Sequence, residues 1–515
     1  MEQKTEKRKK RLCIGYSFWW KVLPFIGLAV WGAFCISPNL WYDEAYSASM
    51  VSRSWMDLIY ITAVDDHSPF YYVLLKIFYH LCGGGTHFWA LKLLSVLFMF
   101  GYLLLGKYYI KKLFDEQTSV WFMVFSLFMP IMTVQAGNVR MYAAALFFMT
   151  LAGLSAADLY RGNRTFVRWT IFCLSGLCAV YCHTFAMIQM VFLYLLFLGA
   201  ILIRKKFSML KGYFISGITV SVIYSPWLLV TLHQMQLRIA NDSGARSAEA
   251  IPTLYTFMDY CKEWFSALET PIPIVVFAGM GLTVFLGYYA VDRMRSQKEY
   301  SAGLGMAAIG LTALTGALVS LYVNPCFLGR YAFPGFGSLA LWYATGMRQI
   351  SSRKIKTVVF AVAAGCFLAQ YASELSLEYD PGLQTYETFL KENVKEEDCI
   401  MGPSEHTIFL NVYHPEKQYF LYGYKLYSLP FVNTDAFTQW YQLEDRGGTV
   451  WYICFDGDTP DRMAERYTWE EALRFHYMYY DFVIYKLQRN SSARHSCGQI
   501  SCSHENLSEL KRQVT

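Results

Sequence analysis

Short polar clusters interrupt a chain that is otherwise strongly apolar. They are Asp43-Glu44, Asp65-Asp66-His67-Ser68-Pro69, Gln135–Tyr142, Tyr181–Phe185 and Arg330-Tyr331. Ionisable side chains at membrane depth are costly, and by default they are candidates for function. A carboxylate can serve as a general base, while Arg and His can bind a phosphate. The clusters therefore predict chemistry on an anionic substrate.

The first cluster supplies the candidate catalytic acids, Asp43 and Glu44. A carboxylate held beside the bilayer could activate a hydroxyl group. Asp is also a favoured helix N-cap, and acidic residues suit the first turn of a helix. Asp43 can fill both roles, so capping remains open beside catalysis.

Candidate phosphate ligands come from three other places in the chain. Ser68 and Pro69 are typical of a helix start, and a helix N-terminus flanked by His67 can also bind an anion. Arg140 and Arg330 are suited to bidentate phosphate binding, although an arginine at the end of a span can also simply snorkel to the surface. Tyr331 is grouped with these ligands.

Four further residues are expected to support this site: Asp66, Asn138, Tyr142 and His183. His183 lies alone between two apolar runs, where a hydrogen-bonded interhelical histidine is more common than a ligand. No metal ligand set is assigned from these residues.

One chemistry joins all of these groups. If a sugar is linked to a polyprenyl phosphate, the lipid tail stays in the bilayer and the sugar–phosphate bond lies at its surface. The leaving phosphate is already a stable anion, so a single carboxylate base is sufficient, with Arg and His stabilising the phosphate. A soluble glycosidase would need two carboxylates.

Composition places the chain in a membrane. Of its 515 residues, 55% are hydrophobic, 18% aromatic and only 16% charged, against about 25% charged in a soluble domain. Many apolar runs reach the roughly 17–22 residues that a membrane span needs. Soluble, disordered and fibrous classes are excluded. The net charge of +6 is spread over loops, which gives no nucleic-acid surface, and the 13 cysteines suggest no metal cluster.

Basic residues orient the chain. Clusters at 107–112, 161–168, 204–206, 293–298 and 348–356 fall in alternate connections, which puts these connections and the basic N-terminus in the cytoplasm. About eleven spans are predicted. They are the first span at 22–36 and those near 87–106, 118–134, 140–158, 166–182, 184–203, 211–230, 271–291, 301–322, 331–349 and 355–376.

This topology divides the chain into four parts. A cytoplasmic N-terminus (1–21) precedes an all-α membrane domain (22–376) with outer loops 38–86 and 231–270. The first loop is expected to hold an interfacial helix near 46–62 and a short interfacial or re-entrant one at 69–82. Residues 378–490 are expected to form a small extracytoplasmic α/β domain, with strands at Cys399–Met401, Gln418–Tyr422, Thr449–Phe455 and Asp481–Leu487. The tail 491–515 reads as disordered.

Taken in order, the motifs resemble the membrane-embedded GT-C glycosyltransferases that use polyprenyl-phosphate sugars. The similarity is to family 39, which includes the aminoarabinose transferase acting on lipid A and the protein O-mannosyltransferases. The motifs are Trp41–Tyr46, Asp66–Tyr72, Arg140–Tyr142, Tyr181–Phe185, Ser225–Trp227 and Arg330–Pro334. The resemblance implies that Asp43 is the essential acid of the first loop, that the region from His67 to Pro69 meets the lipid phosphate, and that Arg330 is a further phosphate contact.

The chain departs from that pattern at two positions. Ser68 stands where many relatives have the first proline of a Pro-Pro pair, and Asn138 stands where they often carry an acid. Some relatives use a divalent metal. With Asn138 neutral, Asp43, Glu44 and Asp66 would have to supply its ligands.

The sequence therefore predicts a glycosyltransferase of the cytoplasmic membrane that acts at the outer face on a polyprenyl-phosphate sugar. A transporter or flippase for lipid-linked sugars remains an alternative, although no repeat between the two halves is apparent. A polysaccharide ligase or polymerase is another alternative. The sugar and the acceptor, whether protein, lipid or cell-wall glycan, stay open.

Overall fold

The computed structural model describes residues 2–65, 67–85, 88–241, 254–265, 272–322, 327–422, 431–437, 441–444 and 447–490. The chain up to Asp380, together with 431–432, forms one compact unit, and the chain from Pro381 onward forms a second. The first unit is built of helices, and the second contains a sheet.

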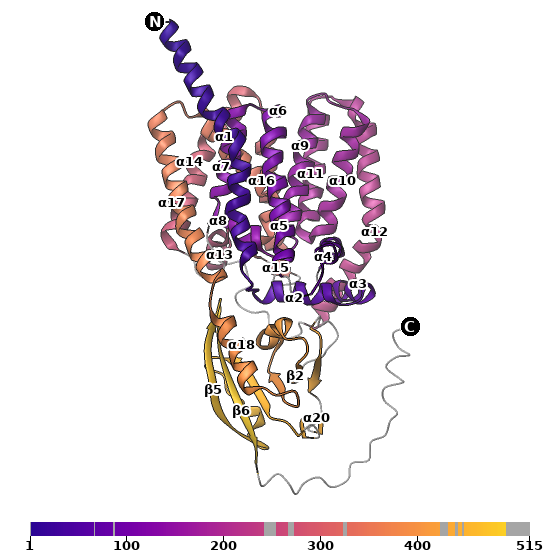
Figure 1. Cartoon of the computed structure of the whole chain (residues 1–515). Helices are drawn as coiled ribbons and strands as arrows, with labels where there is room; N and C mark the ends of the chain where they lie inside the picture. The colour runs from indigo at the N-terminus through magenta and orange to yellow at the C-terminus, as the bar shows by residue number, and fades with distance from the viewer. Residues whose placement is uncertain are drawn as a thin grey trace. The chain divides into compact units, whose positions relative to one another are not determined.

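Long apolar helices make up the first unit (Figure 1). They are α1 (Glu2–Ile36), α5 (Phe88–Leu104), α7 (Glu116–Phe128), α9 (Tyr142–Tyr160), α10 (Phe166–Cys182), α11 (Thr184–Ile203), α12 (Leu210–Asn241), α14 (Pro273–Gln297), α15 (Ser301–Tyr322), α16 (Phe336–Gln349) and α17 (Arg353–Glu378). α5 continues through a π-helical turn (Leu105–Ile110) into α6 (Lys111–Leu113). The interior lies around α7, α9 and α16, where Phe122, Leu146 and Leu339 are fully buried.

By length and composition, eight helices of the described residues could cross a membrane, or up to nine if one bent pair counts as a span. The chain is a multi-pass membrane protein. About eleven spans were predicted, and the difference has local causes. The run 118–134 breaks into α7 and α8 (Pro130–Gly137) at an angle of 70°, since Pro130 cannot continue the hydrogen bonding of α7. The run 331–349 begins as a 3-10 helix (Gly329–Gly335) and leaves α16 with 14 residues. α10 has only 17 residues.

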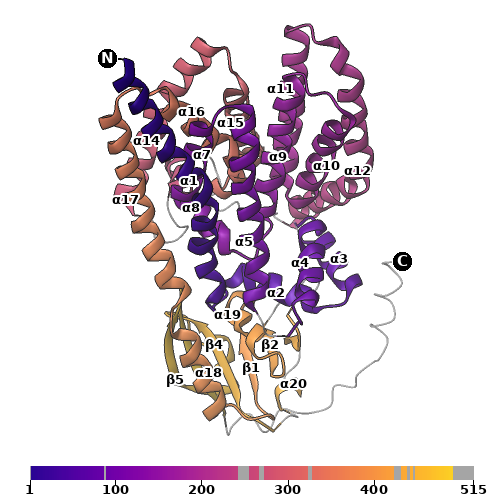
Figure 2. The same ribbon diagram turned by 45° about the horizontal axis from the view of Figure 1, so that its top comes forward.

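Three short helices connect α1 to α5: α2 (Tyr42–Ser52), α3 (Trp55–Val64) and α4 (Pro69–Leu81). Figures 1 and 2 show α2 and α3 across one end of the helices, beside the end of α1. α4 fits the short helix predicted at 69–82. The single interfacial helix predicted near 46–62 is wrong in two respects. Ser54 caps a new helix there by accepting from the Asp57 amide (3.1 Å), and α2 is buried along most of its length, including Ser47 on its supposed polar face.

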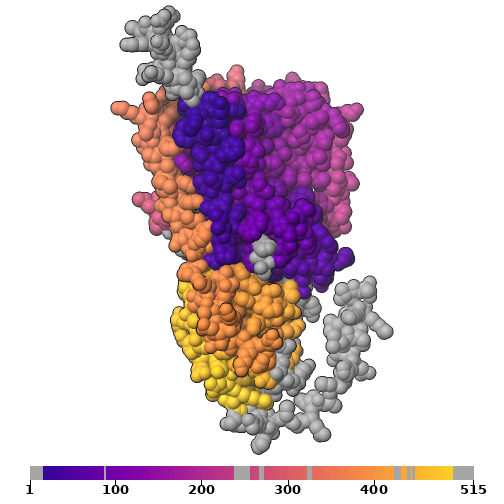
Figure 3. Space-filling view, viewed as in Figure 1, coloured from indigo at the N-terminus to yellow at the C-terminus, as the bar shows by residue number. Residues whose placement is uncertain are grey.

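Polar contacts fasten the end of α17 to the start of the chain. Lys92 of α5 is fully buried and pairs with Glu378, the last residue of α17. The Asn39 amide donates to the Asp380 carbonyl (2.8 Å) and the Tyr379 hydroxyl to the Ala33 carbonyl (2.8 Å). Figure 3 shows α1 and α17 side by side on one face of the unit. These contacts therefore hold the segment between α1 and α2 in place.

The second unit contains a six-stranded sheet of order β3-β2-β1-β4-β6-β5. The strands are β1 (Cys399–Gly402), β2 (Gln418–Tyr422), β3 (Thr434–Phe437), β4 (Val450–Phe455), β5 (Tyr467–Tyr477) and β6 (Tyr480–Arg489), with helices α18 (Gly382–Asn393), α19 (Glu405–Ile408) and α20 (Tyr441–Glu444). β1 to β4 pair in parallel, and β6 runs antiparallel to β4 and β5. The four predicted strands match β1, β2, β4 and β6. The sequence did not reveal β3, which is short, or β5, whose Glu470–Arg474 segment contains good helix formers.

The buried pair of Lys92 and Glu378 gives a stability prediction. Lys92→Met leaves the Glu378 carboxylate without its cation, so we expect the free energy of unfolding to fall by about 3–5 kcal/mol. Lys111→Met breaks a half-exposed pair with Glu116 and should cost about 1 kcal/mol or less. Thermal unfolding of the purified protein compares the two variants, and equal losses would contradict a structural role for the buried pair.

Candidate active site

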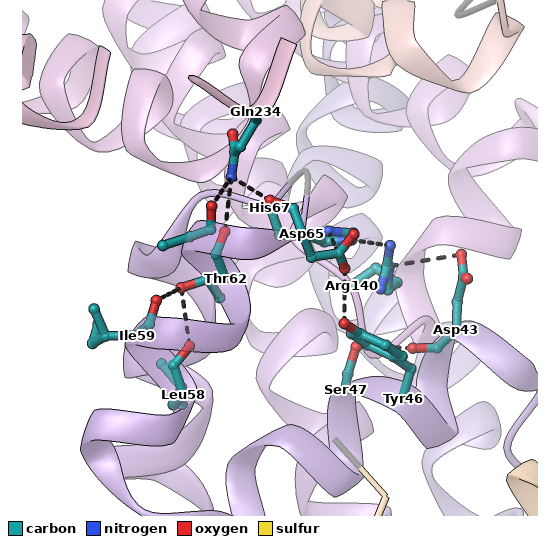
Figure 4. A network of polar contacts seen from close by, with 11 residues as sticks. Asp43, Tyr46, Ser47, Leu58, Ile59, Thr62, Asp65, His67, Arg140 and Gln234 are labelled. Atoms are coloured by element: carbon teal, nitrogen blue, oxygen red, sulfur yellow. Dashed lines mark hydrogen bonds and ion pairs between the residues drawn. The ribbon is translucent and has the colours of Figure 1, made fainter. Parts of the chain in front are cut away.

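Asp43 lies in the first turn of α2. α2 and α3 run across this end of the long helices. The N-cap position belongs to Trp41, so the predicted capping role of Asp43 is wrong by two residues. Its carboxylate points instead toward Arg140, with Asp43 Oδ2 and Arg140 Nε 3.7 Å apart (Figure 4). The backbone carbonyl of Asp43 accepts from the Ser47 hydroxyl (2.9 Å), which steadies this turn.

Glu44, the next residue, is buried and turned toward the segment before Arg140. Its Oε1 accepts from the Val139 amide (2.9 Å) and its Oε2 from the Trp41 amide (3.3 Å). Burial raises the pKa of this carboxyl above its usual value. Both oxygens are thus occupied by backbone donors, and Glu44 ties α2 to the segment before Arg140.

Arg140 joins the separate clusters. It follows α8, is only 6% exposed, and its guanidinium contacts both Asp43 and the Nε2 of His67. His67 Nδ1 lies 3.1 Å from Asp65 Oδ2, and the Tyr46 hydroxyl donates to the same oxygen (2.8 Å). The first loop and the α8–α9 connection therefore meet in one network, which Figure 4 shows.

Asp65 is ionised within this network. Burial alone would raise the pKa of its carboxyl, but His67, the Tyr46 hydroxyl and the charge of Arg140 outweigh burial and hold the pKa well below its usual range. Gln234 of α12 fixes the backbone here. Its Nε2 donates to the carbonyls of Thr62 (2.9 Å), Ala63 (3.1 Å) and Asp65.

An aromatic cluster extends the network toward Arg330. The His183 ring lies 5.4 Å from the ring of Tyr142 and 5.4 Å from that of Tyr331. Its Nδ1 accepts from the Phe185 amide (3.0 Å), so His183 caps α11. Burial, and then the neighbouring His67, Arg140 and Arg330, lower the pKa of His183 to about 3, which leaves it neutral at pH 7.

Arg330 reaches this cluster from the 3-10 helix that precedes α16. Its amide donates to Glu263 Oε2 (2.7 Å) on α13 (Leu254–Phe265), while its own Nε is buried without a hydrogen-bond acceptor among the described residues. Burial lowers the pKa of the guanidinium, but acidic groups around it outweigh burial and raise it. Those groups include the phenol of Tyr142 and the carboxyls of Glu263 and Asp43.

Gly329 permits this arrangement. A Cβ at position 329 would lie 2.3 Å from the Tyr260 carbonyl oxygen and 2.8 Å from the Glu263 Cβ. Without a side chain at Gly329, α13 packs directly against the 3-10 helix, and the Trp264 indole donates to the Gly329 carbonyl (3.2 Å).

The structure thus gathers most of the predicted site residues at one end of the helices. Asp43, His67 and Arg140 are in contact, and Tyr142, His183, Tyr331 and Arg330 adjoin them. Asn138 instead bonds Trp41 and Gln135, and Asp66 lies outside the described residues. Among the described residues, no three His, Cys, Asp or Glu side chains are placed to hold a metal ion.

Sequence reasoning assigned no site role to Glu263, Gln234 or Tyr46, although Tyr46 ends one of the family motifs. Each makes its contact with a residue that is distant in the chain or on another helix, and none stands in a polar cluster. The charged stretch of Lys262 and Glu263 before Trp264 was the one local signal for Glu263.

Comparison with solved structures identifies the fold. The chain is similar to ArnT from Cupriavidus metallidurans in the apo state and to the same protein bound to undecaprenyl phosphate. Each comparison gives a TM-score of 0.63 at 12% sequence identity and covers 91% of this chain and 98% of ArnT. No protein-family model matches the sequence, and no curated protein matches it. The chain therefore has the GT-C fold of ArnT, as its motifs predicted.

The position of Glu44 yields a prediction that separates it from Asp43. Glu44→Gln keeps the size of the side chain but replaces one acceptor by an amide donor, which then faces a backbone N–H. We expect the free energy of unfolding to fall by about 1–3 kcal/mol, measured by thermal unfolding. Asp43→Asn, at a partly exposed carboxylate, should change it by less. A more severe loss in Asp43→Asn would reverse these assignments.

Proposed function

We propose that this chain is a membrane glycosyltransferase that moves a sugar from a polyprenyl-phosphate donor to an acceptor. The reaction takes place at the outer face of the cytoplasmic membrane, with the N-terminus in the cytoplasm and the second unit outside. The observation that carries the proposal is the grouping of the Asp43 carboxylate with two arginines and a histidine at one end of the apolar helices. The fold shared with ArnT, one structure of which holds undecaprenyl phosphate, supports the donor class.

In the proposed reaction, Asp43 accepts the proton of the acceptor hydroxyl. The acceptor oxygen forms a bond to the anomeric carbon as the bond from that carbon to the phosphate oxygen breaks. The electron pair of the broken bond stays with the phosphate, which leaves as polyprenyl phosphate. Since this leaving group is a stable anion, no second carboxylate has to donate a proton, and Glu44 is not needed for the chemistry.

The cations have complementary roles. The Arg330 side chain offers a buried Nε–H without an acceptor, so we assign it to the donor phosphate. Arg140 carries further positive charge beside Asp43, where the same phosphate can lie, and His67 is in contact with Arg140. Neutral His183 holds α11 and supports Tyr331 rather than binding the donor. Buried donors that await a charge are how enzymes stabilise a leaving phosphate.

The position of these groups favours transfer over transport. Transporters of lipid-linked substrates place their polar residues near the bilayer midplane. Here the polar cluster lies at the ends of helices, around the first turns of α2, α9 and α11, as suits a substrate whose head group stays at the membrane surface.

Asp43→Asn provides the central test. The amide cannot accept a proton, so we expect the rate of transfer from radiolabelled polyprenyl-phosphate hexose to membrane acceptors to fall by about 10²–10⁴-fold. Donor affinity should change little, because the arginines remain. Purified wild type and variant are compared for turnover and for donor binding.

Asp57→Asn is the matched control, since Asp57 is an exposed acid of the same loop and its loss should leave transfer unchanged. Wild-type turnover in Asp43→Asn would remove Asp43 from the mechanism. Equal inactivation of both variants would point to damage to the loop instead of loss of a base.

Arg330 gives a second, independent test. Arg330→Gln removes the charge but keeps polarity, so we expect transfer to fall about 10²-fold and donor binding to weaken. Arg330→Lys keeps the charge without the planar fork and should recover only part of the loss. Arg353→Gln, at an exposed arginine of α17, serves as control. Unchanged donor affinity in Arg330→Gln would exclude the phosphate contact.

A further inference from the structure

A second large feature lies at the opposite end of the helices. A cavity of about 890 Å³ is lined mainly by α9, α11, α15 and α16. α9 begins at Tyr142 in the candidate active site and ends at Tyr160 on the cavity wall. Its 19 residues span about 28 Å, close to the thickness of the hydrocarbon layer. The basic mouth of the cavity is therefore remote from Asp43, while its inner wall reaches Met149 in the middle of α9 and Gly337 at the start of α16.

Two glycines help to create this space. A Cβ added at Gly153 of α9 or at Gly199 of α11 would meet no atom within 4 Å, so both helices present bare backbone to the cavity. The remaining wall is mostly apolar and includes Leu193, Leu196 and Leu304. Protein interiors leave few voids larger than a water molecule, and a cavity of this volume has the size of a ligand site.

The mouth of the cavity is basic. Arg161, Arg204, Lys206 and Lys298 line it, and Glu299 is the one carboxylate among its lining residues. Glu299 pairs with Arg161, so that contact offsets only one of the four charges.

Arg204 and Lys206 contact aromatic rings and a carbonyl group, which do not neutralise their positive charges. Arg204 lies over the Tyr300 ring at 5.9 Å, and Lys206 donates to the Tyr160 carbonyl (2.6 Å) while lying 3.7 Å from its ring centre. Burial, and then the charges of Arg164 and Arg204, lower the pKa of Lys206, as expected where positive charge accumulates. An anion at this mouth would be stabilised.

We propose that this cavity binds an anionic glycerophospholipid, with its phosphate against Arg204, Lys206 and Lys298 and its acyl chains along the leucine-rich wall. An apolar wall beneath a basic rim matches an amphiphile with a negative head group. A free phosphate or nucleotide would leave the apolar wall unfilled. Leu195 and Ile203, which also line the cavity, are 56% and 79% exposed, so the cavity is open to an entering lipid.

This lipid is distinct from the sugar donor of the proposed function. A donor whose head group lies at Asp43 cannot place its phosphate at Lys206, at the other end of α9. The inference does not rest on glycosyl transfer, and its test measures binding alone.

Binding of phosphatidylglycerol to the purified full-length protein tests the proposal, with phosphatidylcholine and polyprenyl phosphate as comparisons. We expect phosphatidylglycerol to bind at least about tenfold more tightly than phosphatidylcholine. The double substitution Arg204→Gln with Lys206→Gln should weaken phosphatidylglycerol binding by about tenfold or more. Arg353→Gln with Lys354→Gln removes the same charge from exposed positions outside the cavity and should leave binding within about twofold of wild type.

A second variant keeps every charge. Gly153→Phe would place a phenyl ring in the cavity from a Cβ that meets no atom, so phosphatidylglycerol binding should weaken while the thermal unfolding midpoint stays near that of wild type. Equal affinity for the two phospholipids, unchanged binding in the Arg204/Lys206 variant, or displacement of phosphatidylglycerol by an equal concentration of polyprenyl phosphate would each overturn the proposal.

Discussion

The cost of burying the guanidinium of Arg140 organises the candidate site. A buried charge without compensation costs several kcal/mol, so polar groups must converge on it. Asp43 arrives from α2 and His67 from the start of α4, and Asp65 in turn pairs with His67. One cation thus joins three stretches of chain.

Three acidic and amide side chains around this network hydrogen-bond to backbone groups. Glu44 accepts from two amides, Gln234 donates to the carbonyls at the end of α3, and Glu263 accepts from the amide of Arg330. Each fixes a segment that carries a candidate functional residue. The adjacent acids Asp43 and Glu44 therefore have different contacts. Asp43 and Glu44 are separated by about 100° around the helix axis, so one reaches Arg140 while the other is committed to the interior.

The sequence predicted the fold class because apolar length and alternating basic connections are local signals. It predicted the grouping of Asp43, His67, Arg140 and Arg330 because sidedness placed them at one face. It could not predict the bend at Met129, which depends on how the rest of the bundle accommodates Pro130, or the burial of α2, which depends on neighbours far away in sequence. For the same reason, the sequence did not predict the roles of Glu263 and Gln234. The Glu263 contact requires the bare backbone of Gly329, and the Gln234 contact requires the end of α3 to reach α12.

Arg330 differs from two arginines at the basic end of the first unit, although the buried Nε of Arg293 at that end also lacks an acceptor among the described residues. At the basic end, Arg348 lies 3.2 Å from Asp115, and Arg168 lies 3.2 Å from Asp158, so carboxylates already satisfy them. Near Asp43, the buried Nε of Arg330 has no acceptor among the described residues, and Glu263 takes up its backbone amide instead. A snorkelling arginine would send its guanidinium into water, where acceptors are plentiful. A buried donor without an acceptor costs free energy in every molecule, and a ligand anion that accepts from it recovers that cost. Under the proposed function, this anion is the phosphate of the donor.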